Sequence, residues 1–344
     1  DSVNAGINIS DTIFICTVDA DSILDPNALQ SVLEPMLSSP STFVSGGQLA
    51  AANDVTLVNS NVVTSKMPTN LWVLWQIVEY IKSFMISKIG LSRINSLLVM
   101  SGAFSVYRKN DLEAVGGFLS KLNRSDYLAS TIGVGKHTVC EDMEIVVRLW
   151  RYYRDNGIKG NAVFVPTPVC WTEVPENGRN LFRQRTRWHL GLAETLYIHR
   201  DMIFEPKYGV TALFALPYSF IFEFLSPVIK LFAIIFIIAA SLTGFIDGKV
   251  VFLFTTGVLL LTAIFTSTIT VFIEAWSQHH GTHLRDALRY RNFKDWFFML
   301  IVAIAGDFSY SFFKMAAQLN GTLNFLRKKS EWNKFQRKGF NTCN

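Results

Sequence analysis

Apolar and polar positions divide the chain into two regions. Up to about residue 207, charged side chains are scattered among short apolar runs, whereas the sequence beyond it is strongly apolar. Apolar stretches of about 20 residues are long enough to cross a bilayer. The pattern therefore predicts a folded polar domain followed by an all-α transmembrane region.

The first region alternates between strand-like and helix-like segments. Strands are expected at residues 12–18, 43–49, 104–107 and 162–165, and helices at 25–37, 71–89, 111–116, 141–154 and 179–199. Strands that alternate with helices predict an α/β domain with a mostly parallel sheet. The run at 12–18 is uninterrupted, which is typical of a buried parallel strand.

The expected sheet is small. Its four strands are fewer than the about five or six of a typical sheet. The chain also opens with Asp1, in a helix-like stretch that runs directly into the first strand. We therefore expect the N-terminal half of this domain to be missing from the sequence.

The second region contains four apolar stretches. Residues 228–246 and 250–275 are expected to cross the membrane. The stretches at 211–225 and 296–317 are ambiguous, the latter because it holds two charged residues. The loop at 278–295 and the C-terminal tail are basic, and the positive-inside rule places both on the cytosolic side, with the first domain.

These patterns divide the chain into four expected parts. They are a partial α/β domain at residues 1–178, an amphipathic interface helix at 179–210, transmembrane or interfacial helices at 211–317, and a basic cytosolic tail at 318–344. The net charge of +5 is compatible with anionic lipid or sugar phosphates and does not indicate nucleic-acid binding. The four cysteines lie far apart without metal-site spacing, so we expect reduced thiols.

Two aspartates, Asp19 and Asp21, follow the first expected strand. Ligands of open α/β sheets bind beyond the carboxyl ends of strands. Two carboxylates there offer hard oxygen ligands for a divalent metal, Mg²⁺ or Mn²⁺, that bridges a diphosphate. The alternative is a strand-to-helix loop whose aspartates only cap the next helix.

A second acidic pair, Glu141 and Asp142, opens an expected helix. Acids in the first turn complement the helix dipole, so a purely structural role accounts for them as well. The functional interpretation makes Asp142 a general base that accepts a proton from a hydroxyl group.

A helix face carries Gln184, Arg187 and Trp188 at spacings of three and four residues. Together they present an amide, a guanidinium that can bind phosphate and an indole on which a sugar ring can stack. The alternative is a basic amphipathic helix resting on the membrane, in which Arg183 and Arg185 also face the lipid surface.

Two further segments are candidates for the same site. The small residues Ser101, Gly102 and Ala103 would let backbone approach a ligand closely, or would only form a tight turn. Trp171 could line a sugar groove, or could belong to the core.

In this order, the motifs resemble glycosyltransferase family 2, in the membrane-integrated branch that includes cellulose, chitin, hyaluronan and poly-N-acetylglucosamine synthases. The segments that carry the resemblance are residues 4–7, 18–22, 101–104, 141–142, 172–175 and 184–188. The DxD, ED and QxxRW patterns match without substitution, and the tail at 332–340 looks like that of poly-N-acetylglucosamine-type synthases. The family's earlier strand and aspartate pair, which bind the nucleoside, have no counterpart here.

The resemblance implies a GT-A-type, Rossmann-like fold and an inverting transfer from a UDP-sugar. By this resemblance Asp21 and Asp19 would hold the metal and diphosphate, and Asp142, beside Glu141, would be the base. Gln184, Arg187 and Trp188 would grip the diphosphate and the acceptor end, with residues 101–103 near the acceptor sugar.

The expected partners are a UDP-sugar donor, a polysaccharide acceptor and the lipid bilayer, with a small membrane subunit as a further candidate. We expect an integral protein of the plasma (inner) membrane with a cytosolic catalytic domain and N-acetylglucosamine as the sugar. A single transfer to a lipid acceptor, and a non-catalytic membrane scaffold, stay open as alternatives.

Overall fold

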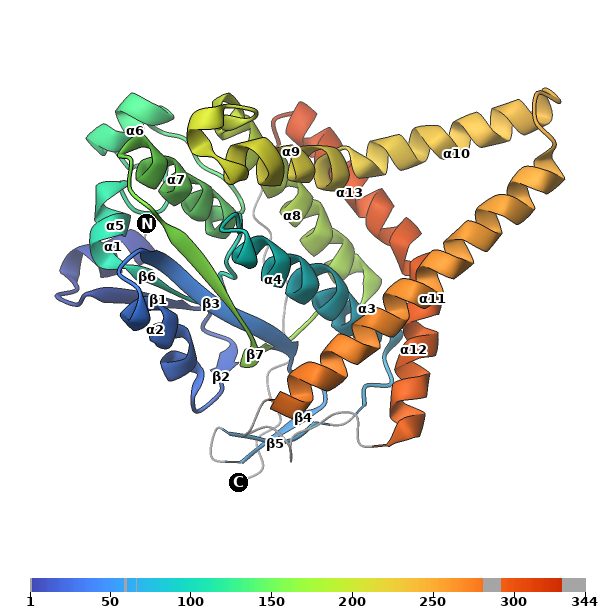
Figure 1. Ribbon diagram of the computed structural model, residues 1–344, viewed down its shortest axis with the longest axis horizontal. Helices are drawn as coiled ribbons and strands as arrows, with labels where there is room; N and C mark the ends of the chain where they lie inside the picture. Colours follow the sequence, from blue (N-terminus) through green and yellow to red (C-terminus); the bar gives the residue numbers. More distant parts are fainter. Residues whose placement is uncertain (1, 59–60, 66, 281–291, 330–344) are drawn as a thin grey trace.

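The computed structural model describes residues 2–58, 61–65, 67–280 and 292–329 (Figure 1). Much of the basic loop that we expected at 278–295, and most of the basic tail, lie outside the described residues. The remaining chain forms an α/β domain from which two long apolar helices project.

The central sheet is mixed. Its strands follow the order β1 (Phe14–Val18), β6 (Phe104–Arg108), β3 (Thr42–Ala51), β7 (Asn161–Thr172) and β2 (Ser22–Leu24). Only the β3–β7 pair is parallel among these, and the other three pairings are antiparallel. The α/β class is confirmed, but the expectation of a mostly parallel sheet is wrong, because an apolar run indicates burial and not strand direction.

Strand β1 lies at an edge of this sheet. It pairs antiparallel with β6 alone, and its residues are half-buried or exposed, with Val18 44% exposed. The expectation of a buried parallel strand at 12–18 is therefore wrong. The apolar run instead lines an open cavity, so that the strand ends where a ligand can reach it.

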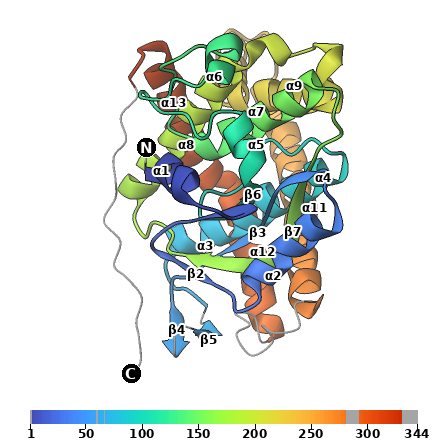
Figure 2. The ribbon, with the colours of Figure 1, turned by 90° about the vertical axis from the view of Figure 1, so that its left-hand side faces the viewer.

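Helices cover both faces of the sheet. Helix α2 (Ala28–Ser38) packs against one face through Val32 and Met36. Helix α7 (Glu141–Asp155) covers the other face, where Trp150 meets Phe43 edge-to-face with ring centroids 4.9 Å apart. Figures 1 and 2 show α2 and α7 on opposite sides of the sheet.

The segment expected as one helix at 71–89 is continuous and longer. It comprises α3 (Leu71–Glu79), a π-helical turn (Tyr80–Met85) and α4 (Ile86–Arg93). Asn70 caps its first turn by accepting the Trp72 backbone N–H at 2.9 Å.

The smaller elements surround this core. They are α1 (Ser2–Ile9), α5 (Lys109–Ala114), α6 (Asp126–Thr131), the hairpin of β4 (Val55–Val58) and β5 (Asn61–Ser65), and 3₁₀ turns at Arg200–Met202 and Pro206–Tyr208.

Helix α8 (Gly178–Ile198) joins the sheet domain to the apolar region. It packs along α13 (Tyr310–Leu326), where the Thr186 hydroxyl donates to the Ala317 carbonyl at 3.1 Å. Its other side meets the start of α7. There a Cβ atom added at Gly191 would collide with the Cys140 side chain and would lie 3.0 Å from the Cys140 backbone nitrogen. Glycine at this position therefore permits the close approach of α7 and α8.

The apolar region contains one helix, α11 (Gly248–His280), whose stretch Gly248–Phe272 is long and apolar enough to cross a membrane. Two bent pairs qualify only when each is taken as one span: Thr211–Phe224 with α10 (Ser226–Leu242), bent by 44°, and α12 (Phe293–Phe308) with α13, bent by 45°. The described residues thus hold between one and three candidate spans.

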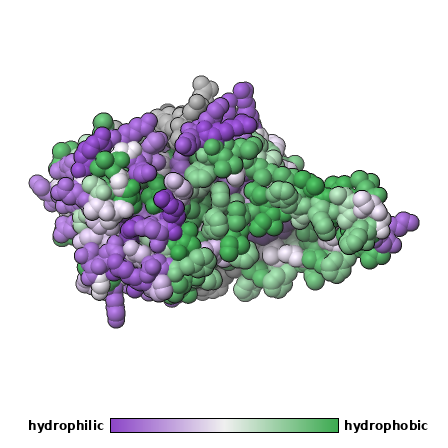
Figure 3. Space-filling view, turned by 90° about the horizontal axis from the view of Figure 1, so that it is seen from above, coloured by the Kyte–Doolittle hydropathy of each residue, from purple (hydrophilic) through white to green (hydrophobic). Residues whose placement is uncertain are grey.

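The bent pairs depart from the expected boundaries. The first begins with π-helical turns at Thr211–Ala215 and Ser219–Phe224 around α9 (Leu216–Tyr218). In the second, α13 continues to Leu326, beyond the boundary that we expected at residue 317. Figure 3 shows that apolar residues dominate the projecting part, with a polar tip at the loop between α10 and α11.

We expect Gly191→Ala to destabilise the protein by about 1–3 kcal/mol, because the added methyl group overpacks the contact with Cys140. Gly90→Ala is the matched control, since its added Cβ meets nothing within 4 Å. Alanine favours helices, so the control should be unchanged or more stable. Thermal unfolding of purified protein measures both, and equal melting temperatures would contradict the close α7–α8 approach.

Candidate functional site

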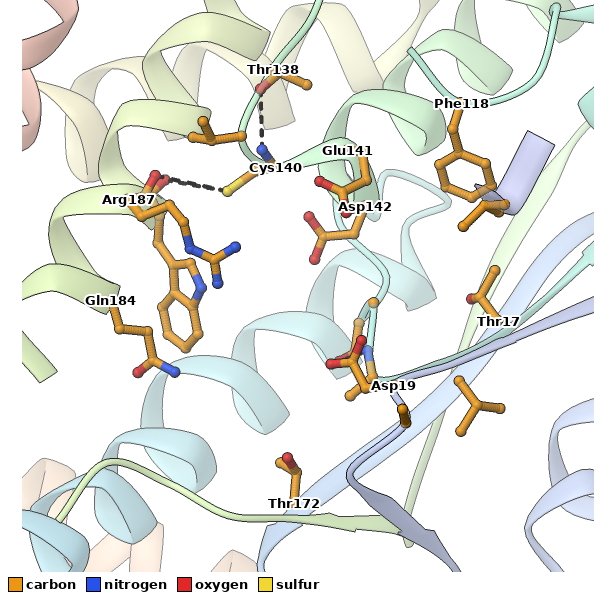
Figure 4. A pocket seen from close by; sticks show the side chains of 18 of the residues that line it. Thr17, Asp19, Phe118, Thr138, Cys140, Glu141, Asp142, Thr172, Gln184 and Arg187 are labelled. Carbon is orange, nitrogen blue, oxygen red and sulfur yellow. Dashed lines mark hydrogen bonds between the residues drawn. The ribbon is translucent and has the colours of Figure 1, made fainter. Parts of the chain in front are cut away.

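One large cavity, of about 1520 Å³, gathers nearly all of the residues singled out in the sequence. They come from segments far apart in the chain (Figure 4). The lining includes Asp19, Asp21, Ser101, Gly102, Ala103, Glu141, Asp142, Gln184, Arg187 and Trp188.

Strand pairing brings the first acidic pair to the small-residue turn. Val18, the last residue of β1, pairs with Phe104, the first residue of β6. The Asp19 backbone N–H then donates to the Ala103 carbonyl at 3.2 Å. The end of β1 and the turn before β6 therefore form one continuous wall of the cavity.

Asp142 lies against the same turn. A Cβ atom built on Gly102 would lie 3.6 Å from the Asp142 Cβ, which is ordinary contact. The carboxyl group accepts hydrogen bonds from the backbone N–H of Met143, at 3.0 Å, and of Gly102. Asp19 and Asp142 thus stand on either side of residues 101–103.

Burial raises the pKa of Asp142, although the positive charges of Lys88 and Arg187 and two backbone donors oppose the rise. Burial likewise raises the pKa of Glu141, and the negative charges of Asp142 and Asp19 add to this effect. The negative charges of the site therefore interact with one another, and the positive charge of Arg187 acts on both Glu141 and Asp142.

Lys88 is a further residue of the site that no sequence motif indicated. It lies on α4, and burial lowers its pKa to about 8, with the negative charge of Asp142 acting in the opposite direction. The only signal in the sequence was a lysine in an amphipathic helix, and such a lysine ordinarily points to solvent.

On α8, the expected face of Gln184, Arg187 and Trp188 lines the cavity, and Figure 4 shows Gln184 and Arg187 on the side opposite Asp19. Arg185 does not face a lipid surface, because it is only 3% exposed and is bonded to Glu79. The membrane-surface interpretation therefore fails for Arg185.

Trp171 does not line the cavity, so its expected place there is wrong. It is 7% exposed and packs with Ala52 and Val55. Its neighbours Thr172 and Glu173 line the cavity instead. Successive side chains of a strand point to opposite faces, so Trp171 cannot share the cavity-facing side of β7 with Thr172, whereas Glu173 lies beyond the end of the strand.

The donor set fits a divalent metal held together with a substrate. Among the described residues, no group of three or more His, Cys, Asp or Glu side chains could hold a metal. Asp19 and Asp21 offer two carboxylates at the cavity wall. Mg²⁺ is commonly bound by one or two carboxylates plus substrate phosphates, so two are sufficient.

Comparison with known proteins decides the family. The sequence model described as "Glycosyl transferase family group 2" matches residues 14–273, most of the chain. The chain belongs to this family. The resemblance expected from the ordered motifs is therefore confirmed.

Curated relatives of this family 2 chain are polysaccharide synthases. Hyaluronan synthase of Streptococcus pyogenes is 24% identical over 180 residues, 52% of this chain and 36% of the relative. Poly-beta-1,6-N-acetyl-D-glucosamine synthase of Staphylococcus epidermidis is 23% identical over 195 residues, 57% of this chain and 39% of the relative. The aligned part thus spans well under half the length of these relatives.

A solved structure with the same fold is the mannosyltransferase PcManGT from Pyrobaculum calidifontis, in complex with GDP-Man and Mn²⁺. The TM-score is 0.50 at 14% identity, over 95% of this chain and 66% of that chain. This similarity and the family match confirm the GT-A-type α/β fold of the family 2 chain.

The raised pKa of Asp142 predicts a pH-dependent effect of Asp142→Asn on stability. A raised carboxyl pKa gives stability that is present below the ordinary value, about 3.9, and is lost as the pH rises through the raised value. The amide variant cannot ionise, so its melting temperature should exceed that of the wild type by an amount that grows as the pH rises above about 4 and levels off once the raised pKa of Asp142 is passed.

Thermal unfolding at a series of pH values, without added metal, measures this difference. Glu113→Gln, at an exposed residue, controls for the loss of one negative charge. Parallel curves for wild type and Asp142→Asn would contradict the burial of an ionisable carboxyl group at this position.

Proposed function

We propose that this protein is a membrane-bound, inverting β-glycosyltransferase that transfers N-acetylglucosamine from a UDP-sugar to a growing polysaccharide. The observation that carries the proposal is the shared cavity of Asp19, Asp21 and Asp142. The names of the curated relatives support a polysaccharide product, and one of them names N-acetylglucosamine.

The donor would bind at the end of β1. Asp21, with Asp19, would hold a divalent metal together with the donor diphosphate, as the nucleotide-sugar and Mn²⁺ of the structural neighbour suggest. When bound, the metal would neutralise the negative charge of the departing diphosphate.

Asp142 is the proposed general base. The acceptor hydroxyl oxygen forms a bond to the anomeric carbon of the donor sugar as its proton passes to the Asp142 carboxylate. The bond from that carbon to the diphosphate oxygen breaks, and its electron pair leaves with UDP. Attack opposite the leaving group inverts an α-linked donor to a β-linked product.

The positive charges of Lys88 and Arg187 would keep Asp142 ionised, and Arg187 would also bind the donor. The base must be ionised before transfer, and the positive charges of Lys88 and Arg187 lower its pKa against the effect of burial. A base whose pKa is moderately raised accepts a proton more readily than an ordinary aspartate. Arg187 also lies at the cavity, where its guanidinium can bind diphosphate oxygens.

The acceptor would lie between α8 and residues 101–103. Trp188 offers an apolar ring face to a sugar, and Gln184 offers an amide donor. Asn320 and Asn324 of α13 also line the cavity and can bind sugar hydroxyl groups. The apolar helices beside this wall would anchor the protein in the plasma (inner) membrane, with the cavity on the cytosolic side.

Asp142→Asn should lower turnover by about 10²–10⁴-fold, the range typical of a lost general base. The assay is UDP release by purified full-length protein at saturating donor. Glu113→Gln, at an exposed acid outside the cavity, should retain wild-type turnover. Full turnover in the Asp142→Asn variant would contradict the proposed mechanism and would favour a non-catalytic scaffold.

Product size separates polysaccharide synthesis from a single transfer to lipid. A panel of radiolabelled UDP-sugars, supplied with Mn²⁺ to full-length protein in membranes, should give a ladder of products from UDP-N-acetylglucosamine. Chelation by EDTA should abolish the ladder. A single lipid-linked band would contradict polymer synthesis. Full activity in EDTA would contradict the requirement for a divalent metal.

A further inference from the structure

A buried carboxylate, Glu79, lies behind the cavity wall where three helices meet. It stands at the end of α3 and is 7% exposed. From α8 it accepts Arg185 Nε at 3.0 Å and Nη2 at 2.5 Å. From α13 it accepts the Tyr310 hydroxyl at 2.7 Å, and Lys314 Nζ lies 3.3 Å from its other oxygen.

Arg185 extends this network to the cavity. Its Nη1 donates to the side-chain carbonyl of Gln184 at 2.6 Å. Its guanidinium carbon lies 4.1 Å from the centroid of the Trp188 ring. One arginine therefore contacts both cavity residues while Glu79 holds its other nitrogens.

The network keeps Glu79 charged. Burial by itself would raise the pKa of Glu79, but the positive charges of Arg185 and Lys314 and the Tyr310 hydrogen bond lower it to about 2. Buried ion pairs are often no more stabilising than apolar residues of the same size. Overall stability is therefore a weak explanation for this network, and the fixed orientation of its members is a stronger one.

We propose that Glu79 is a positioning residue that, through Arg185, orients the Gln184 amide and the Trp188 indole toward the sugar. This inference rests on the proposed function of the cavity. It gives Arg185, which is buried and is not among the cavity-lining residues, a role in the transfer.

The geometry shows how the positioning works. An amide is planar, so fixing the Gln184 carbonyl on Arg185 leaves its NH₂ group for the cavity, and Figure 4 shows the nitrogen on the side nearer Thr172. The guanidinium stacked on the Trp188 ring holds the plane of the indole in one orientation at the cavity wall. Groups held in place before binding lose less entropy when the ligand arrives.

The test compares Glu79→Gln with Asp307→Asn in full-length protein. Asp307 forms an ion pair with Lys82 at 2.7 Å that is more exposed than that of Glu79 and has no contact with α8 in the described network, so it controls for the loss of an ion pair between helices. We expect Glu79→Gln to raise the KM for acceptor or donor about tenfold, equivalent to about 1.4 kcal/mol, with a smaller change in kcat. Asp307→Asn should leave KM unchanged.

A double-mutant cycle isolates the positioning effect. In a Gln184→Ala, Trp188→Ala background, Glu79→Gln should change KM little further, because the groups that it orients are gone. If Glu79→Gln does not fold, Tyr310→Phe replaces it. That variant removes one donor to Glu79 and leaves the ion pair with Arg185, so a smaller rise in KM is expected.

The outcomes for the function and for this inference are distinct. Full turnover of Asp142→Asn refutes the proposed function whatever Glu79 does. If Asp142→Asn is inactive and the Glu79 and Asp307 variants have the same KM as wild type, only the positioning role is overturned. A rise in KM that persists in the doubly substituted background overturns it as well.

Discussion

The site depends on the close approach of the α7 N-terminus to two neighbouring elements. Gly102 contacts Asp142 on one side, and Gly191 of α8 lets Cys140 pack on the other. This arrangement encloses the Asp142 carboxyl group, raises its pKa, and brings Arg187 and Lys88 within electrostatic reach. The acidic pair after β1 enters the same enclosure because β1 and β6 are paired.

Helix α8 contributes to the cavity of the α/β domain and also packs against the apolar helix α13. One face lines the cavity, while Arg185 on another side is joined to α3 and α13 through Glu79. The cavity-lining side chains of Gln184 and Trp188 are therefore connected, through Arg185 and Glu79, to contacts that join α13 to α8 and α3. Loss of those contacts is expected to affect substrate binding as well as stability.

The acidic pairs and the α8 face that the sequence singled out line one cavity, and the spacing of three and four residues explains why Gln184, Arg187 and Trp188 share a helix face. Their roles in the reaction stay predictions. The sequence did not predict the direction of the strands. The strand expected at 162–165 is also shorter than β7, in which Pro166 follows Val165, and prolines ordinarily mark strand ends or bulges. The register of β3 against β7 does shift near this point. Trp171, Lys88 and Glu79 depend on tertiary packing, and no local pattern distinguishes them.

A disulfide cross-link tests whether Asp142 lies against the turn at residues 101–103. The Cβ–Cβ separation of 3.6 Å between a residue built at Gly102 and Asp142 is within the usual disulfide range of about 3.5–4.5 Å. Under mild oxidation, the double variant Gly102→Cys, Asp142→Cys should form this disulfide in most molecules, as detected by peptide mass spectrometry. Two thiols that stay separately alkylated in folded protein would contradict the contact between Asp142 and Gly102, and with it the enclosed carboxyl group.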